Sequence, residues 1–233
     1  MLALTTGTGA CILVGGLLAR IEHIRPEWLE TEFRHSVIAF GGGVLVAAVA
    51  LVLVPEGTRL LPSPWLAVAL FFTGGLAFCL FEAQLTRRGG EKPQFSAMLL
   101  DYLPESLALG GMFASGSPLA PMLALLIGLQ NLPEGFNAFR ELTADERGKE
   151  PRTLLLMASV IPLGPAFGVF GWAFAGNHPA FLGAVMLFAA GGILYLLFQD
   201  IAPQSRLNRH WAPTLGAVLG FCLGMLGNLL LQR

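Results

Sequence analysis

The sequence predicts an all-α polytopic membrane protein, a single domain with eight transmembrane helices. Hydrophobic residues make up 55% of the chain and charged residues only 12%, whereas about a quarter of the residues in an average soluble domain are charged. Apolar stretches of about 20 residues, the length that a helix needs to cross a bilayer, recur along the whole chain. The polar gaps between them are too short to form a soluble domain.

Eight apolar stretches are long enough to cross the bilayer. We expect spans at residues 2–19, 36–58, 64–85, 94–116, 118–139, 153–175, 179–200 and 212–231. Apolar residues begin at Leu2 with no basic segment before them, so we expect the first stretch to remain as a span and not to be removed as a signal peptide. The whole chain, residues 1–233, is then one transmembrane domain.

The distribution of basic residues predicts how these spans are oriented. Twelve of the fourteen Lys and Arg residues fall in alternate gaps, namely those after the first, third, fifth and seventh spans. Cytoplasmic loops of membrane proteins are enriched in Lys and Arg. We therefore expect a multi-pass protein of the plasma (inner) membrane with both termini outside the cytoplasm.

Carboxylates stand inside the predicted spans, where an ionisable side chain is costly and marks a functional site. Asp101 and Glu105 lie within the fourth span, and Glu134 lies within the fifth. No Lys or Arg lies within either span to neutralise them. Such groups need a proton, a bound cation or a water-filled cavity.

The carboxylates belong to a short sequence motif that occurs in both the fourth and the fifth span. The fourth span reads Asp-Tyr-Leu-Pro-Glu-Ser from Asp101, and the fifth reads Gln-Asn-Leu-Pro-Glu-Gly from Gln130. Residues four apart share one face of a helix, so Asp101 lies on the face of Glu105, and Gln130 lies on the face of Glu134. The proline before each glutamate removes a backbone hydrogen bond and tends to kink the helix, which frees a carbonyl group toward a cavity.

The two repeats are expected at the same depth. The fourth span runs outward and the fifth inward, and the polar residues lie about five to eleven positions from the cytoplasmic edge. With a rise of ~1.5 Å per residue, the two sets overlap within one helical turn. We therefore predict that four oxygen donors converge in the inner half of the bilayer: Asp101, Glu105, Gln130 and Glu134.

Two carboxylates at the ends of spans carry a weaker signal. Glu56 follows Pro55, and a lone Pro-Glu usually marks only a helix boundary. Asp200 stands at the cytoplasmic end of the seventh span, where a solvated residue is an equally good explanation. A helix boundary does not explain two Pro-Glu repeats in the middle of adjacent spans.

Several motifs occur in the order found in one family of transporters. Residues Leu129–Gly135 match a fifth-helix QNxPEG signature, and Ala189–Tyr195 followed by Asp200–Pro203 resembles a seventh-helix AAGxMxY…EIxPE pattern. Gly41–Val44 leading to Pro55-Glu56 resembles the second helix. On these motifs the chain resembles the ZIP (Zrt/Irt-like) metal transporters, closest to the GufA-type branch, over nearly its whole length.

The resemblance implies a ZIP-like bundle in which an inverted repeat relates spans one to three to spans six to eight, around helices 4 and 5. It also implies alternating-access transport of zinc and related divalent ions toward the cytoplasm, often by a homodimer. Members of this branch have two metal positions. By resemblance, the first would use Asp101, Glu105, Gln130 and Glu134, and the second would add Asn131.

The chain departs from the pattern of that branch at the metal positions. The usual fourth-helix HNxPEG begins here with Asp101 and Tyr102, and the sixth-helix glutamate aligns with Ile161. The seventh-helix PES reads Pro-Gln-Ser at Pro203–Ser205. The second position has thus lost ligands, while the first keeps only oxygen donors. An all-oxygen set suits harder ions such as Mn, Mg or Ca, although zinc also accepts carboxylates.

We therefore expect a secondary transporter, not an enzyme, whose substrate is a divalent metal ion (Zn, Cd, Mn or Fe) and which holds no permanent cofactor. We expect the protein to be embedded in the lipid bilayer. We expect no nucleic-acid partner, since a net charge of −1 gives no general attraction to nucleic acid. The alternative is a degenerate ZIP-like membrane protein that binds metal or a partner without transport. An intramembrane metal hydrolase fits less well, because no nucleophile or general base accompanies the carboxylates.

Overall fold

The computed structural model describes residues 1–21, 27–87, 93–144, 150–207 and 210–231. Within these ranges the chain is almost entirely helical and has no β-strand, which confirms the all-α class. In chain order the elements are α1 (Leu2–Ile21), α2 (Glu27–Ala48), the π-helical segment η1 (Val49–Leu53), α3 (Val54–Arg59), α4 (Pro64–Arg87), α5 (Pro93–Ala114), α6 (Ala120–Thr143), α7 (Glu150–Val160), α8 (Leu163–Ala173), the 3-10 turn η2 (Ala175–Asn177), α9 (Pro179–Leu196), the π-helical segment η3 (Leu197–Ile201), α10 (Ala202–Gln204) and α11 (Leu215–Leu231).

Five helical segments of the described chain are long and apolar enough to cross a membrane, which indicates a membrane-embedded protein. They are Leu2–Ile21, Glu32–Arg59, Pro64–Leu85, Glu150–Asn177 and Pro179–Gln204, and they coincide with five of the eight predicted spans. Helix α11 is apolar but has 17 residues. Helices α5 and α6, with 22 and 24 residues, are long enough but carry too many polar groups to join the five. The eight-span arrangement therefore stays a prediction.

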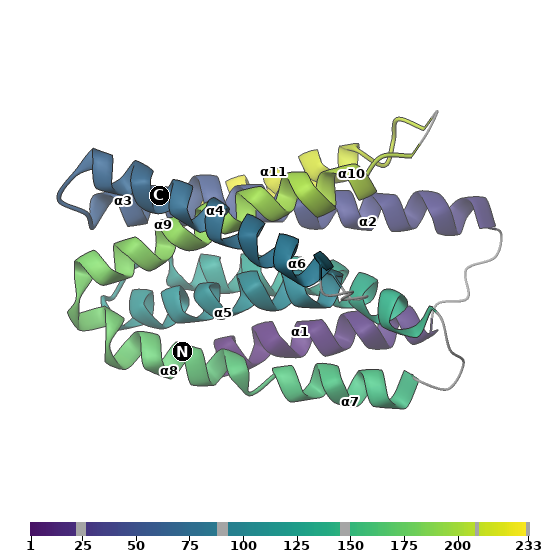
Figure 1. Cartoon of the computed structure of the whole chain (residues 1–233), viewed down its shortest axis with the longest axis horizontal. Coiled ribbons are helices and arrows are strands. Elements are labelled where there is room, and N and C mark those ends of the chain that lie inside the picture. Colours follow the sequence, from purple (N-terminus) through teal and green to yellow (C-terminus); the bar gives the residue numbers. More distant parts are fainter. Residues whose placement is uncertain (22–26, 88–92, 145–149, 208–209, 232–233) are drawn as a thin grey trace.

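The two polar helices lie together inside the bundle (Figure 1). Helix α1 packs along α6, α8 packs along α5, and α2 and α9 also contact this central pair. On the outside, α11 packs on α2, and α4 packs on α9. Neighbouring helices therefore shield much of α5 and α6 from lipid, so polar side chains on these two helices can be accommodated.

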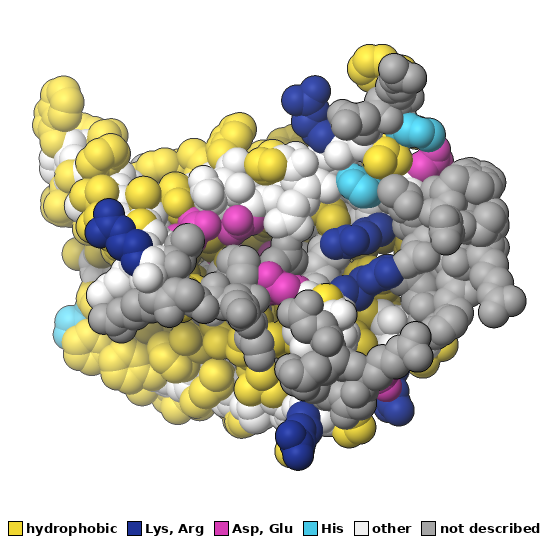
Figure 2. All heavy atoms as spheres, turned by 45° about the vertical axis from the view of Figure 1, so that its right-hand side comes forward, with side chains coloured by type: hydrophobic (Ala, Val, Ile, Leu, Met, Phe, Trp, Pro, Cys, Tyr) yellow, Lys and Arg dark blue, Asp and Glu magenta, His cyan; other side chains and the backbone are white. Residues whose placement is uncertain are grey.

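The two ends of the bundle differ in charge. Helix α10 lies at one end, while α3, the start of α1 and the end of α11 lie toward the other (Figure 1). Figure 2, which brings the α10 end forward, shows basic, acidic and histidine side chains gathered there and hydrophobic side chains over the flanks. The α10 end is thus the one that the distribution of basic residues assigns to the cytoplasm. Which membrane the protein occupies, and which way round it sits, remain predictions.

The π-helical segments show how the second and seventh predicted spans correspond, two spans that the resemblance pairs in an inverted repeat. Residues Gly41–Thr58 and Ala189–Arg206 align without a gap, and η1 and η3 then occupy the same positions. In each copy one residue separates the π-helical segment from a proline, Pro55 or Pro203. The α2–η1–α3 and α9–η3–α10 segments end at opposite ends of the bundle (Figure 1), so the two copies run antiparallel, as an inverted repeat requires.

Glycines allow α1 to approach α6 backbone to backbone. A Cβ atom on Gly15 would lie 2.2 Å from the carbonyl oxygen of Leu132, and a Cβ atom on Gly135 would lie 2.2 Å from that of Ile12. Small residues are the usual means of close helix packing in lipid, because apolar burial alone does not drive helices together there. The α1–α6 contact therefore depends on the absence of side chains at these two positions.

We predict that Gly15→Ala destabilises the protein by about 1–3 kcal/mol, the range for forcing an extra methyl group into a packed interface. Gly7→Ala is the matched control on the same helix, since a Cβ there meets nothing within 4 Å. The measurement is the thermal unfolding midpoint of each purified variant in detergent. Equal midpoints for the two variants would contradict the close α1–α6 packing.

Candidate functional site

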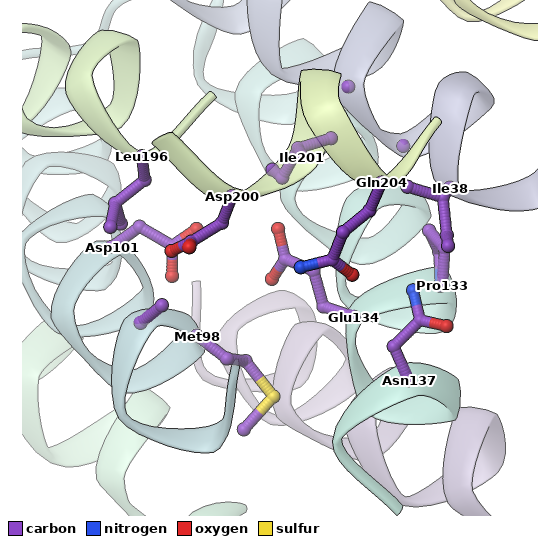
Figure 3. Close-up of a pocket in the computed structure, with 13 residues that line it drawn as sticks. Ile38, Met98, Asp101, Pro133, Glu134, Asn137, Leu196, Asp200, Ile201 and Gln204 are labelled. Carbon is purple, nitrogen blue, oxygen red and sulfur yellow. The ribbon is translucent and has the colours of Figure 1, made fainter. Parts of the chain in front are cut away.

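A small cavity of about 50 Å³ lies among α2, α5, α6 and the α9–η3–α10 segment. Five polar side chains line it together with apolar ones: Asp101, Glu134, Asn137, Asp200 and Gln204. In Figure 3 the carboxylates of Asp101, Glu134 and Asp200 point into the same space, and the amides of Asn137 and Gln204 lie beside Glu134. The cavity thus collects oxygen atoms from three separate parts of the chain.

The oxygens at this cavity lack positive partners. Asp101 is only 3% exposed, and its Oδ1 atom has no hydrogen-bond partner in the described protein. The same holds for both carboxylate oxygens of Glu134 and for one oxygen each of Asn137 and Asp200. The residues that line the cavity include no Lys, Arg or His. A buried acceptor without a donor costs about 1–3 kcal/mol, so the cluster favours a proton or a cation as its partner.

Glu105 and Gln130 form a second polar layer next to the cavity. Both are fully buried, and the Gln130 Nε2 group donates a hydrogen bond of 2.8 Å to Glu105 Oε2. They lie one helical turn from Asp101 and Glu134, on the side away from α10. The structure therefore brings the four predicted residues together in two adjacent layers and not around one point.

Asn131 points away from the cavity. Its Nδ2 group donates a hydrogen bond of 2.8 Å to the carbonyl oxygen of Thr8 on α1. Its Oδ1 atom is buried and has no hydrogen-bond partner in the described ranges. In this structure Asn131 therefore links α6 to α1 and does not add to the oxygens at the cavity.

Tyr102, which stands where the motif of the resembling family has an asparagine ligand, is buried against α1 and α8. The residue is fully buried, and its hydroxyl group donates to the carbonyl oxygen of Thr5 at 3.4 Å. A Cβ atom on Gly9 would lie 2.5 Å from that hydroxyl, and one on Gly164 would lie 2.0 Å from it. The phenol is thus seated between two glycines of α1 and α8.

The carboxylates do not form a closed metal centre in this structure. Among the residues that the structure describes, no group of three or more His, Cys, Asp or Glu side chains could hold a metal ion as it stands. The side chains of Asp101, Glu134 and Asp200 would therefore have to rearrange to coordinate an ion.

Two residues of the cavity were not identified as candidates from the sequence. Asn137 follows Glu134 by three positions, so the two side chains share a face of α6. This spacing extends the polar face that begins at Gln130 and was available as a signal. Gln204 had a signal only through the resemblance, as the residue in place of the glutamate of the seventh-helix PES motif, and the packing of α10 brings it to α5 and α6. Asp200, for which solvation was an equal alternative, lines the cavity.

Comparison of the chain with profiles of known protein families finds no match, and comparison with curated proteins finds none either. The resemblance to ZIP transporters therefore rests on the sequence motifs, and membership in that family remains a proposal.

A cross-linking experiment tests the shared cavity. In a protein whose native Cys11, Cys79 and Cys222 are replaced by Ala, we expect a short bifunctional thiol reagent to join Asp101→Cys to Glu134→Cys. A protease site inserted in the turn between α5 and α6 reveals the link, because the two fragments then stay together on a denaturing gel. Asp101→Cys with Asn131→Cys is the control, since Asn131 faces α1. Equal cross-linking of both pairs would contradict the arrangement.

Proposed function

We propose that the protein is a secondary transporter that moves a divalent metal ion across the membrane through the cavity between α5 and α6. The observation that carries this proposal is the set of buried, unpartnered carboxylate oxygens of Asp101 and Glu134 inside a bundle of apolar helices. We include membership in the ZIP family in the proposal, on the strength of the sequence motifs. Transport toward the cytoplasm is part of that family assignment.

A metal ion suits this cavity better than protons alone. A proton neutralises one carboxylate, but it leaves the amide oxygen of Asn137 and the remaining carboxylate oxygens without donors. One divalent cation accepts several oxygen ligands at once. Because carboxylate and amide oxygens favour hard cations, we propose a preference shifted from zinc toward ions such as manganese. The ions to be compared are Zn, Cd, Mn, Fe(II) and Mg.

Alternating access requires that the cavity open to one side at a time. Toward the α3 end, the hydrogen-bonded Glu105 and Gln130 and the seated Tyr102 fill the interior. Toward the α10 end, Gln204 belongs to the lining. The filled interior toward the α3 end supports the interpretation of this structure as a conformation closed toward that end. The inverted repeat with its two π-helical segments supports a second conformation directed the other way, since π-helical segments are frequent at functional sites.

A metal-binding relative without transport is the second candidate. Tyr102 and Ile161 occupy the region of the second metal position, and the backbone of Ile161 would lie 3.1 Å from a Cβ on Gly9. A protein that had lost transport would retain a cavity that binds an ion and lose the movement. Flux measurements separate the two candidates, because binding without flux supports only the second.

We predict saturable uptake of at least one divalent ion into proteoliposomes, and at least a tenfold loss of that uptake in the Asp101→Asn/Glu134→Gln variant. A tenfold loss corresponds to only about 1.4 kcal/mol of binding free energy, less than we expect from removing two charged ligands. Glu150→Gln is the control, since this half-exposed carboxylate pairs with Arg20, and neither residue lines the cavity. No uptake of any of the five ions by folded, inserted wild-type protein would contradict the proposal.

A separate variant tests the choice of ion. Asp101→His introduces the nitrogen ligand that zinc prefers, so we expect the ratio of zinc to manganese uptake to rise. Asp101→Glu keeps an all-oxygen set and is expected to preserve the wild-type ratio. The measurement is competition between the two ions during uptake. An unchanged ratio in the histidine variant would show that Asp101 does not contact the ion.

A further inference from the structure

The internal repeat gives Gln204 a counterpart at the other end of the bundle. In the alignment of Gly41–Thr58 with Ala189–Arg206, Pro55 corresponds to Pro203 and Glu56 to Gln204. Gln204 lines the cavity on the side of α10. Glu56 belongs to α3, which lies toward the end of the bundle opposite to α10 (Figure 1).

Glu56 also lies on the core-facing side of its helix. Val52 and Leu53, one turn earlier, are fully buried. Residues three and four apart share a helix face, so the Glu56 side chain continues this buried face and is only 14% exposed. Its counterpart Gln204 likewise follows Asp200 by four residues, and both Gln204 and Asp200 line the cavity. The carboxylate of Glu56 is therefore held toward the interior and not against lipid.

The partner of Glu56 is the Arg59 side chain of the same helix. The Arg59 Nη2 and Glu56 Oε2 atoms are 2.7 Å apart, and the Arg59 side chain is 67% exposed. An ion pair between neighbours on one helix, with one partner so exposed, is weak. A divalent cation with more charge than a guanidinium group competes well for such a carboxylate.

We propose that Glu56 is the first protein ligand that the cation meets at the α3 end of the pathway, with Arg59 as a counter-ion that the cation displaces. This inference rests on the proposed transport function. It assigns to the second predicted span the first capture of the ion, a step that neither the cavity nor the Pro-Glu repeats of α5 and α6 provide. The corresponding neutral residue, Gln204, then stands where the ion leaves.

Two substitutions with opposite expected effects test the proposal. Glu56→Gln removes the ligand, so the ion concentration for half-maximal uptake should rise at least about threefold with little change in the maximal rate. Arg59→Gln removes the competitor, so that concentration should fall. Both effects should shrink as ionic strength increases, because salt screens exposed charges. Uptake is measured in cells, where the ion reaches the predicted outer face.

A purely structural ion pair gives a different result. Either substitution breaks such a pair, so both variants would then change uptake in the same direction, and this outcome would overturn the inference. Arg20→Gln and Glu150→Gln are the controls, because they break another pair, with 3.7 Å between Arg20 Nε and Glu150 Oε2, and should leave the half-maximal concentration unchanged. Normal transport with no effect of either Glu56 or Arg59 overturns only the inference, whereas absent transport in the wild type overturns the proposed function itself.

Discussion

The structure depends on one constraint: carboxylates held among apolar helices need a positive partner. Asp101 and Glu134 stand on the two central helices, and none of the described residues that line their shared cavity is basic. Shielding by α1, α2, α8 and α9 lets these helices carry polar groups that would be costly against lipid. Burial among these helices also lowers the local dielectric constant, which strengthens the attraction of the carboxylates for a cation. Fold and proposed function thus follow from the same arrangement.

Close packing of α1 is the second requirement of the site. Because Gly15 and Gly135 let the two backbones approach, carbonyl oxygens of α1 come within reach of polar side chains on the central helices. Asn131 and Tyr102 each donate a hydrogen bond to such a carbonyl oxygen. These contacts satisfy the donor groups of Asn131 and Tyr102 and do not reach the carboxylate oxygens at the cavity. The two sides of the central pair therefore have different chemistry.

The two-layer arrangement bears on what the cavity can hold. The hydrogen bond between Gln130 and Glu105 occupies the layer nearer α3, while the layer nearer α10 contains carboxylate oxygens of Asp101, Glu134 and Asp200 that lack donors. In the proposed transporter, a cation that enters the layer nearer α10 finds oxygen ligands at once. To move through the layer nearer α3, it must break the hydrogen bond between Gln130 and Glu105. In the proposed transporter, this layer would separate the two sides of the membrane, together with Tyr102.

The sequence by itself determined the helical class and the character of most spans, because long apolar stretches have few alternatives to a helix in lipid. It also identified Asp101 and Glu134, because a carboxylate in an apolar stretch stands out from its neighbours without any knowledge of packing. Only the tertiary structure decided which polar groups share the cavity. Gln204 arrives there through the packing of α10, and Asn131 turns to α1, because a side chain's partners depend on the neighbouring helices. Helix periodicity fixes the face of a residue within its own helix but not the helix that this face meets.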